Sequence, residues 1–336
     1  MFKNKSILIT GGTGSFGKAF VEHMIKHHSN FRKLVIFSRD ELKQYEMSIE
    51  KKFSHPNVRM ILGDIREYRS LRRAFQNMDI IIHAAALKQV PTAEYNPFEF
   101  IKTNILGSQN IIEAALDSNV KKVIALSTDK ASSPVNLYGA TKLCSEKLFI
   151  SANNIKGKRD INFSVVRYGN VMGSRGSVVP LFLKKHLAGN KLPLTDERMT
   201  RFNISLEEAI ELVFKSLQKN NGGEIFIPKI PSFKIVDLIK AISPQNKNEV
   251  IGIRQGEKIH EELISVYESY NTVELKDCYL ILPTNNPAEI DKYCKKYKAK
   301  KVKDGFSYTS QNNSNFLSVS DLRKIIKKKL LFPSSV

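Results

Sequence analysis

Three glycines near the start of the chain limit its fold more than any other feature. In "ILITGGTGSFGKAF", residues 7–20, Gly11, Gly14 and Gly17 separate an apolar run from an amphipathic one. The first glycine permits a tight turn, the second lets the backbone approach a pyrophosphate, and the third lets a helix pack closely on a strand. The phosphates would then meet the free N–H groups of the helix N-terminus. The stretch predicts a strand–turn–helix unit that binds a dinucleotide. The other contacts predicted in this turn are Thr13, Ser15 and Phe16.

Six apolar runs of strand length alternate with helical patterns in the first half of the chain. They span residues 6–12, 33–40, 58–64, 79–86, 122–129 and 163–170. They are nearly continuous in Val, Ile, Leu and Ala, which is typical of strands buried on both faces. The alternation predicts an α/β fold with a Rossmann-type, doubly wound parallel sheet. Ligands of such sheets bind at the carboxyl ends of the strands.

The rhythm changes after residue 170, where short helical patterns mix with a Pro-interrupted tail. We expect residues 1–170 to form the NADP-binding Rossmann domain, with a segment at about 205–230 that returns to it. Residues 171–204 and 231–336 are expected to form a smaller C-terminal substrate-binding lobe with a basic tail. Residues 304–318, rich in Ser and Asn, are expected to be an exposed loop.

The end of the second strand selects the nicotinamide cofactor. A carboxylate there binds the ribose 2′-hydroxyl of NAD, whereas an Arg accommodates the 2′-phosphate of NADP. The stretch "FSRDELK" offers both, as Asp40 and Arg39. Ser38, Arg39 and Lys43 together favour phosphate, so we predict NADP, and Asp40 could instead be a helix N-cap. The further cofactor contacts predicted at strand ends are Asp64, Ile65, Ala84, Ala85, Ala86 and Val171.

Tyr138 and Lys142 form a pair suited to hydride-transfer chemistry. Their spacing of four places both on one face of a helix. A nearby ammonium favours the phenolate, so we expect Lys142 to lower the Tyr138 pKa and also to hold the nicotinamide ribose. Tyr138 could then remove a hydroxyl proton while a hydride leaves the same carbon. Thr128, at the end of the fifth strand, can hydrogen-bond the same hydroxyl.

Asp129 and Lys130 place an acid beside a base directly after Thr128. An enzyme that only transfers a hydride needs no second proton-transfer pair. The residues alone leave two interpretations open: the two side chains form an additional catalytic pair, or they form an ion pair within a loop.

The chain is strongly basic, with 53 Lys and Arg against 33 Asp and Glu, a formal net charge of +20. Such a field attracts polyanions. However, much of the excess lies in Lys-rich stretches near the C-terminus, and scattered Lys of this kind is more often a solvated face than a nucleic-acid groove. We therefore expect no nucleic-acid partner, and Tyr138 and Lys142 argue against a nucleic-acid-binding protein with a mere sensor domain. Without a long apolar run or an apolar leader, we expect no membrane partner and a cytoplasmic location.

Three scattered cysteines, Cys144, Cys278 and Cys294, form no CxxC motif, and we expect reduced thiols. The stretch "KIHEELI" begins like a zinc motif, but Ile264 occupies the position of the second His. We therefore expect no metal site.

The chain as a whole resembles the extended short-chain dehydrogenase/reductases and, more narrowly, the inverting UDP-N-acetylglucosamine 4,6-dehydratases of pseudaminic acid biosynthesis. The resemblance runs from residue 7 to about 262, and residues 263–336 contribute little to it. A sister group of dehydratase/5-epimerases has Met where this chain has Tyr138, so the Tyr favours the pseudaminic type. The stretches that carry the resemblance are "TGGTGSFGK", "FSRDELKQ", "HAAALKQVPTAEYNP", "STDKA", "NLYGATKLCSEKLF", "RYGNVMGSRGSVVP", "MTRF" and "IGIRQGEKIHE".

The resemblance implies a lyase that uses NADP catalytically. A hydride leaves sugar C4, and the resulting ketone acidifies the C5 proton. By resemblance, Lys130 is the base that removes this proton and Asp129 the acid that protonates the departing C6 hydroxyl. Hydride returns to C6, and C5 is reprotonated with inversion, by Lys130 or by Tyr138. The Lys130 pKa would have to fall and the Asp129 pKa would have to rise for these roles.

The same resemblance implies the substrate UDP-N-acetylglucosamine and a homo-oligomer, with a hexamer as one form. The product would enter flagellin glycosylation or a surface polysaccharide. The alternative is a nucleotide-sugar 4-epimerase or reductase on the same fold. The substrate-binding positions that the resemblance implies are Lys88, Asn170, Thr195, Arg201, Arg254 and Glu257.

Overall fold

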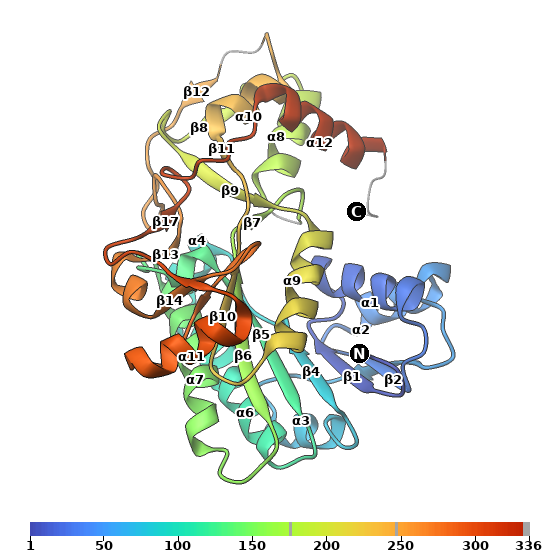
Figure 1. Cartoon of the computed structure of the whole chain (residues 1–336). Coiled ribbons are helices and arrows are strands. Elements are labelled where there is room, and N and C mark those ends of the chain that lie inside the picture. The colour runs from blue at the N-terminus through green and yellow to red at the C-terminus, as the bar shows by residue number, and fades with distance from the viewer. Residues whose placement is uncertain (175–176, 246–247, 332–336) are drawn as a thin grey trace.

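The computed structural model describes residues 1–174, 177–245 and 248–331. A large lobe is built on a ten-stranded sheet, and a small lobe lies beyond the carboxyl ends of its central strands (Figure 1). Residues 175–176 of the stretch "RYGNVMGSRGSVVP", and residues 246–247 and 332–336 of the predicted C-terminal lobe, lie outside the described residues.

The large sheet has the order β16-β14-β15-β10-β6-β5-β4-β1-β2-β3. All six predicted strands are present, and with β10 they form a parallel sheet. The predicted Rossmann-type α/β fold is therefore confirmed. The parallel strands are β1 (Ser6–Thr10), β2 (Lys33–Ser38), β3 (Val58–Leu62), β4 (Ile80–His83), β5 (Lys122–Thr128), β6 (Asn162–Tyr168) and β10 (Ile225–Pro228).

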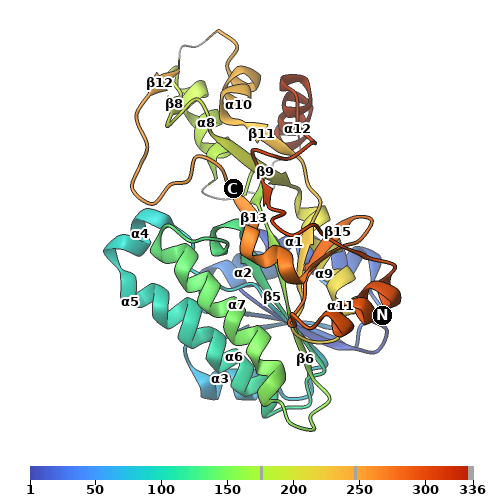
Figure 2. The same cartoon turned by 60° about the vertical axis from the view of Figure 1, so that its left-hand side comes forward.

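Helices cover both faces of the sheet (Figure 2). On one face α1 contacts α9, and on the other α6 packs between α3 and α7. The helix α9 begins with a capping box, in which Ser205 and Glu208 each bond the other's backbone N–H. The helices of this lobe are α1 (Ser15–His27), α2 (Glu41–Ile49), α3 (Tyr68–Ala74), α4 (Val90–Tyr95), α5 (Pro97–Phe100), α6 (Gly107–Leu116), α7 (Leu137–Ile155), α9 (Leu206–Lys219) and α11 (Pro287–Tyr297), with a π-helix at Ile101–Leu106 and 3₁₀ turns at Lys51–Phe53, Asp129–Ala131 and Val266–Asn271.

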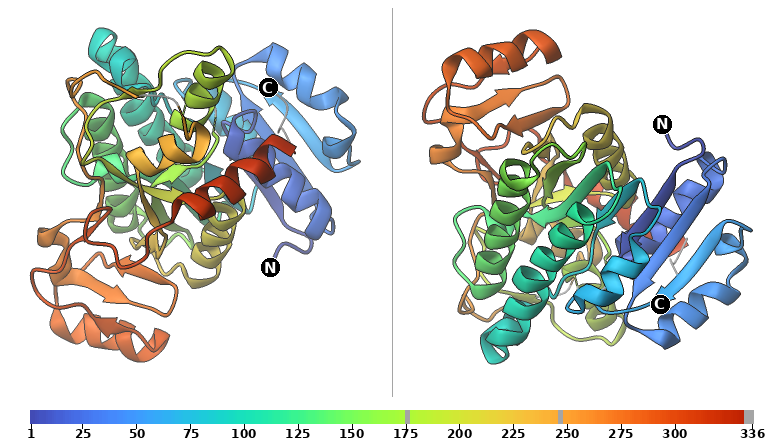
Figure 3. Two further views of the ribbon diagram at one scale, coloured as in Figure 1. Left: turned by 90° about the horizontal axis from the view of Figure 1, so that it is seen from above. Right: turned by 90° about the horizontal axis from the view of Figure 1, so that it is seen from below.

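The small lobe has its own apolar core, separate from that of the large sheet. Phe182, Leu194, Phe233, Leu238 and Leu322 are among its buried side chains. The helices α10 and α12 pack against each other over this core (Figure 3, left). Its elements are β7 (Asn170–Val171), α8 (Val178–Leu187), β8 (Pro193–Leu194), β9 (Thr200–Ile204), β11 (Ser232–Lys234), α10 (Ile235–Ile242), β12 (Glu249–Val250) and α12 (Val319–Leu331). Two further strands, β13 (Glu262–Ile264) and β17 (Tyr308–Thr309), pair with each other.

The structure differs from the predicted boundaries in the C-terminal part. Residues 272–301 were assigned to the lobe, but they return to the large sheet as β14 (Thr272–Glu274), β15 (Cys278–Ile281) and β16 (Lys300–Lys301) (Figure 3, right). β15 pairs antiparallel with β10 and covers an edge that would otherwise be exposed. The expected exposed loop at 304–318 is also wrong in part, because Tyr308 and Ser310 are buried.

In the part of the chain that the structure describes, no helix is long and apolar enough to cross a bilayer. The same described residues contain no group of three or more His, Cys, Asp or Glu side chains placed to hold a metal ion.

Candidate active site

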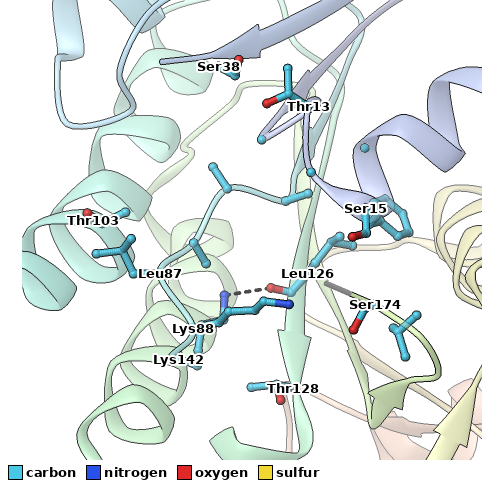
Figure 4. Close-up of a pocket in the computed structure, with 18 of the residues that line it drawn as sticks. Thr13, Ser15, Ser38, Leu87, Lys88, Thr103, Leu126, Thr128, Lys142 and Ser174 are labelled. Atoms are coloured by element: carbon cyan, nitrogen blue, oxygen red, sulfur yellow. Dashed lines mark hydrogen bonds between the residues drawn. The ribbon is translucent and has the colours of Figure 1, made fainter. Parts of the chain in front are cut away.

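A cavity of about 590 Å³ lies along the carboxyl ends of the parallel strands. This volume is within the usual range for small-molecule sites. Figure 4 shows Thr13 and Ser38 at one end of the cavity, Thr128 at the other, and Lys142 nearer to Thr128. The two ends are called the nucleotide end and the chemical end below.

The glycine turn forms the wall of the nucleotide end, and its geometry fits a pyrophosphate. Gly14 is the N-cap of α1 and no side chain caps the helix, so its first N–H groups face the cavity. Gly11 has φ +66°, and a Cβ there would lie 2.8 Å from the Ala85 backbone. A Cβ on Gly17 would lie 2.4 Å from Gly12. The turn therefore needs glycine at these positions, as the sequence predicts.

Charged side chains surround the predicted ribose corner after β2. Asp40 is the N-cap of α2: its carboxylate accepts the backbone N–H of Lys43 at 3.0 Å and also pairs with the Lys43 ammonium. These contacts to Lys43 lower the Asp40 pKa. Arg39 is about half exposed, and its guanidinium lies 3.9 Å from the Asp64 carboxylate. Asp40 is thus the helix N-cap that the sequence analysis gave as its alternative role. Arg39 lines the cavity, with only the distant Asp64 carboxylate as an ion-pair partner among the described residues.

All the predicted cofactor contacts and several of the other predicted site residues line the cavity. Asp129 is the one predicted catalytic residue outside its lining. The predicted residues that line it are Gly11, Thr13, Gly14, Ser15, Phe16, Gly17, Ser38, Arg39, Asp40, Lys43, Asp64, Ile65, Ala84, Ala85, Ala86, Lys88, Thr128, Lys130, Tyr138, Lys142, Asn170 and Val171.

Tyr138 and Lys142 lie on the first turns of α7, which Asn136 caps by accepting the Gly139 N–H at 2.8 Å. Lys142 is buried, and its ammonium donates to the Leu126 carbonyl at 2.8 Å (Figure 4). Burial lowers the Lys142 pKa to about 8. Tyr138 shares a hydrogen bond with Thr128.

The expected effect of Lys142 on Tyr138 is wrong for the protein without ligand. Burial raises the Tyr138 pKa to about 12, because a phenolate loses its hydration there. The cation that opposes this rise is Lys130, not Lys142. The spacing correctly predicts one helix face, but it does not predict which ammonium acts on the phenol.

Asp129, Lys130 and Glu261 form a buried charge cluster at the chemical end. The Lys130 ammonium lies 3.1 Å from Asp129 Oδ1 and 3.0 Å from Glu261 Oε1. Thr128 donates to the same Asp129 Oδ1 at 2.9 Å. Asp129 and Glu261 expose only 1% and 3% of their side chains, so water does little to screen these charges. Asp129 Oδ2 and Glu261 Oε2 have no hydrogen-bond partner among the described residues.

The pKa values of Asp129 and of Lys130 are both raised in this cluster. Burial raises the Asp129 pKa and the Glu261 charge adds to it, while Lys130 opposes the rise. Burial alone would lower the Lys130 pKa, but the charges of Asp129 and Glu261 outweigh it and raise it. The Asp129 shift has the direction that an acid requires. The expected fall of the Lys130 pKa is wrong for the free protein, because the charges of Asp129 and Glu261 together outweigh burial.

The predicted substrate residues divide into two groups. Lys88 and Asn170 line the cavity, and burial together with the charge of Lys130 lowers the Lys88 pKa. Four others do not line it. The Arg201 Nε lies 3.6 Å from Glu261 Oε1, and the Arg254 guanidinium lies 3.8 Å from Glu257. Thr195 is partly buried in the small lobe, directly after β8.

Glu261 is the residue of the cluster that sequence reasoning missed. It is separated from Lys130 by 131 positions, which no local pattern spans. It stands in "KIHEELI", which was considered as a failed zinc motif, and it ends the stretch "IGIRQGEKIHE", from which only Arg254 and Glu257 were predicted as site residues. Its closeness in sequence to the predicted nucleotide contacts Arg254 and Glu257 was the available signal.

Comparisons with known proteins agree with this architecture. Residues 7–283 match the family described as polysaccharide biosynthesis protein. The chain is 52% identical over 333 residues to "UDP-N-acetylglucosamine 4,6-dehydratase (inverting)" of Campylobacter jejuni, covering 97% of this chain and 98% of that one. It is 40% identical over 332 residues to "UDP-glucose 4-epimerase" of Rickettsia massiliae, covering 97% and 96%. The X-ray structure of Pen from Bacillus thuringiensis is similar with a TM-score of 0.87 and 38% identity, covering 97% and 99%.

Proposed function

The chain belongs to the polysaccharide biosynthesis protein family, and we propose that within this family it acts as an inverting UDP-N-acetylglucosamine 4,6-dehydratase. The observation that carries the proposal is the buried cluster of Asp129 and Lys130 beside Tyr138, in a cavity shaped for a dinucleotide. An acid and a base in addition to the Tyr138–Lys142 pair are what elimination of water requires and what simple hydride transfer does not.

The cofactor is a nicotinamide dinucleotide, and we propose NADP. Gly14 and the first N–H groups of α1 would hold the pyrophosphate. Ser38, Arg39 and Lys43 at the end of β2 would hold the 2′-phosphate. When bound, the nicotinamide accepts a hydride from sugar C4 and later returns it to C6.

Tyr138 takes the proton of the C4 hydroxyl while Thr128 orients that hydroxyl. The Tyr138 phenol must lose its own proton first, and its high pKa in the free protein opposes this. A positive charge nearby stabilises the phenolate, and Lys130 already acts in this direction. Removal of the C4 hydrogen leaves a ketone, which makes the adjacent C5 proton acidic.

Elimination then needs an acid and a neutral amine. One proton moved across the 3.1 Å contact from the Lys130 ammonium to the Asp129 carboxylate produces both. Lys130 removes the C5 proton, and Asp129 protonates the C6 hydroxyl. The C5–H and C6–O bonds break, a C5–C6 double bond forms, and water leaves. A hydride at C6 and a proton at C5 complete the 6-deoxy-4-ketosugar, with inversion when the proton arrives on the opposite face.

We further propose the finer assignments that the family suggests. The substrate-binding positions Lys88, Asn170, Thr195, Arg201, Arg254 and Glu257 would hold UDP-N-acetylglucosamine between the large lobe and the small substrate-binding lobe. Pseudaminic acid biosynthesis, with flagellin or a surface polysaccharide as its destination, would use the product. A cytoplasmic location is proposed as well, and a homo-oligomer is proposed from the resemblance alone.

The test is incubation of the purified protein with UDP-N-acetylglucosamine, followed by mass spectrometry of the nucleotide sugar. We expect loss of one water without net accumulation of reduced cofactor. In deuterium oxide the product should carry one deuterium at C5, with the inverted configuration by NMR. An unchanged mass, or a change by two hydrogens, would reject the dehydratase.

The second candidate is a nucleotide-sugar 4-epimerase, which the Rickettsia relative's name favours. An epimerase returns the hydride to C4 and leaves the mass unchanged. It would also keep its activity in Lys130→Ala, apart from effects on packing. Product mass and this variant therefore separate the two candidates.

A further inference from the structure

Glu261 faces the proton-transfer pair from a distant segment. It directly precedes β13 and reaches Lys130 at 3.0 Å. Its backbone is fixed on both sides by Ser310: the Glu261 N–H donates to the Ser310 hydroxyl at 2.9 Å, and the Ser310 N–H donates to the Glu261 carbonyl at 2.8 Å. The carboxylate is therefore held in place by buried structure rather than by a loop in solvent.

The chemical end holds two buried carboxyls but unequal numbers of cations around them. Among the residues that the structure describes, Asp129 contacts one cation, Lys130, at 3.1 Å. Glu261 contacts Lys130 at 3.0 Å and also lies 3.6 Å from the Arg201 Nε. When two carboxyls share a buried site, the one with fewer cations takes the proton. Here that carboxyl is Asp129, and Glu261 is the one that stays ionised.

We infer that Glu261 is the positioning residue of the proton-transfer pair: it holds the Lys130 ammonium against Asp129 and, by remaining charged, makes Asp129 the acid. The inference rests on the proposed function. Asp129 Oδ1 accepts hydrogen bonds from Thr128 and Lys130, whereas Oδ2 has no partner among the described residues. The inference explains this difference, because a protonated Oδ2 is a donor to a bound hydroxyl. The shifts agree: the Asp129 pKa is raised, in part by Glu261, and Lys130 and Arg201 hold the Glu261 pKa below its usual value against the effect of burial.

Replacing Glu261 by Gln removes one negative charge from the site. An ionised Asp129 then loses a repulsion and a charged Lys130 loses an attraction, so both groups release their protons at lower pH. Other ionisable groups also face the cluster, and they stay in place in the variant. They are Lys88 after β4, Tyr138 on α7, Arg201 on β9, and Lys258 in the segment that leads into β13. In the same segment His260 neighbours Arg201 and Glu262 neighbours Lys258, rather than the cluster itself.

The experiment measures the pH dependence of dehydration in the full-length holoenzyme, with wild type, Glu261→Gln, Glu261→Asp and Glu262→Gln. Both limbs of the kcat profile should move to lower pH by about one unit in Glu261→Gln. Glu261→Asp keeps the charge and should restore part of the shift. Glu262→Gln is the matched control, because Glu262 bonds Ser132 and Ser133 and does not contact Lys130. A kcat lowered by one factor at every pH would show a structural role only and overturn the inference.

A second readout does not depend on turnover. Protein labelled with ¹³C in its aspartate carboxyls gives a signal for Asp129, assigned by its loss in Asp129→Asn. Its titration should move to lower pH in Glu261→Gln and stay unchanged in Glu262→Gln. An unmoved titration overturns the inference even if wild type dehydrates the sugar. Absence of dehydrated product from wild type, by contrast, rejects the proposed function, while the titration still decides the role of Glu261.

Discussion

The nucleotide end and the chemical end of the same cavity are built in opposite ways. The nucleotide end consists of backbone groups and partly exposed charges from three short stretches, residues 11–17, 38–43 and 63–65. The chemical end consists of buried charges from segments far apart in the chain, with Asp129 and Glu261 almost inaccessible to solvent. Ligand binding at the nucleotide end depends on the shape of the backbone, whereas the chemistry at the chemical end depends on which charged side chains the fold buries next to one another.

This difference has an electrostatic consequence. The Arg39–Asp64 pair at the nucleotide end is open to water, where screening makes each ion pair weak. The Lys130 pairs at the chemical end are shielded, so removing one partner leaves an uncompensated buried charge. We therefore expect substitutions at the chemical end to change rates strongly and those at the nucleotide end to change affinities more moderately.

The largest expected effect is that of Asp129→Asn, which breaks the chemical end alone. Dehydration should fall about a thousandfold, since a positioned acid contributes about that much. Binding of the dinucleotide, measured by fluorescence titration, should stay within about twofold because Asp129 does not line the cavity. A variant that dehydrates the sugar at nearly the wild-type rate would remove Asp129 from the mechanism.

Gly11→Ala breaks the nucleotide end. The positive φ at this position strains any residue with a Cβ, and the new methyl would lie 2.8 Å from Ala85. We expect NADP to bind about thirtyfold more weakly, which corresponds to about 2 kcal/mol. Gly189→Ala is the matched control, because Gly189 has φ +70° and no atom within 4 Å of its Cβ position. Gly189 does not line the cavity, so Gly189→Ala should bind NADP as the wild type does, and a Gly11→Ala variant that does the same would contradict the prediction.

Arg39→Ala tests whether the exposed Arg39 guanidinium at the nucleotide end selects NADP over NAD. NADP should bind about tenfold more weakly, whereas NAD should be unaffected, and the effect should shrink with added salt. Arg66→Ala is the control, since Arg66 contacts Asp64 at 2.7 Å but does not line the cavity. Equal losses for NADP and NAD would contradict the proposed selectivity.

The smallest expected effect concerns the pH dependence of stability through Lys142. Its pKa is lowered from 10.5 to about 8 in the folded protein. A lowered pKa means that the stability contribution is complete above the unfolded pKa and is lost as the pH falls through about 8. Relative to Lys142→Met, nucleotide-free wild type should gain about 1 kcal/mol of unfolding free energy between about pH 7.5 and about pH 9. Urea denaturation at the two pH values measures this, and parallel changes in both proteins would show that Lys142 is not buried as an amine.

Much of the fold could be predicted because its signals are local. The apolar runs predict all six strands, since a strand buried on both faces needs continuous apolar residues. The strands β14, β15 and β16 were missed because they are short. Two of them, β14 and β16, also lack the continuous apolar run that is typical of a strand in a parallel sheet. Only their pairing shows that they belong to the large sheet: β15 pairs with β10, β14 with β15, and β16 with β14.

The sequence by itself determined the glycine turn, the parallel sheet and the shared helix face of Tyr138 and Lys142, since the backbone period fixes these within a few residues. Tertiary structure alone decided the protonation of the chemical end. Glu261 arrives from 131 positions away and is fixed by Ser310, and Asp129 and Glu261 together raise the Lys130 pKa instead of the expected fall. The physical reason is that spacing along a chain sets the face of a helix or strand on which a side chain lies, whereas a pKa depends on distance through space and on the exclusion of water.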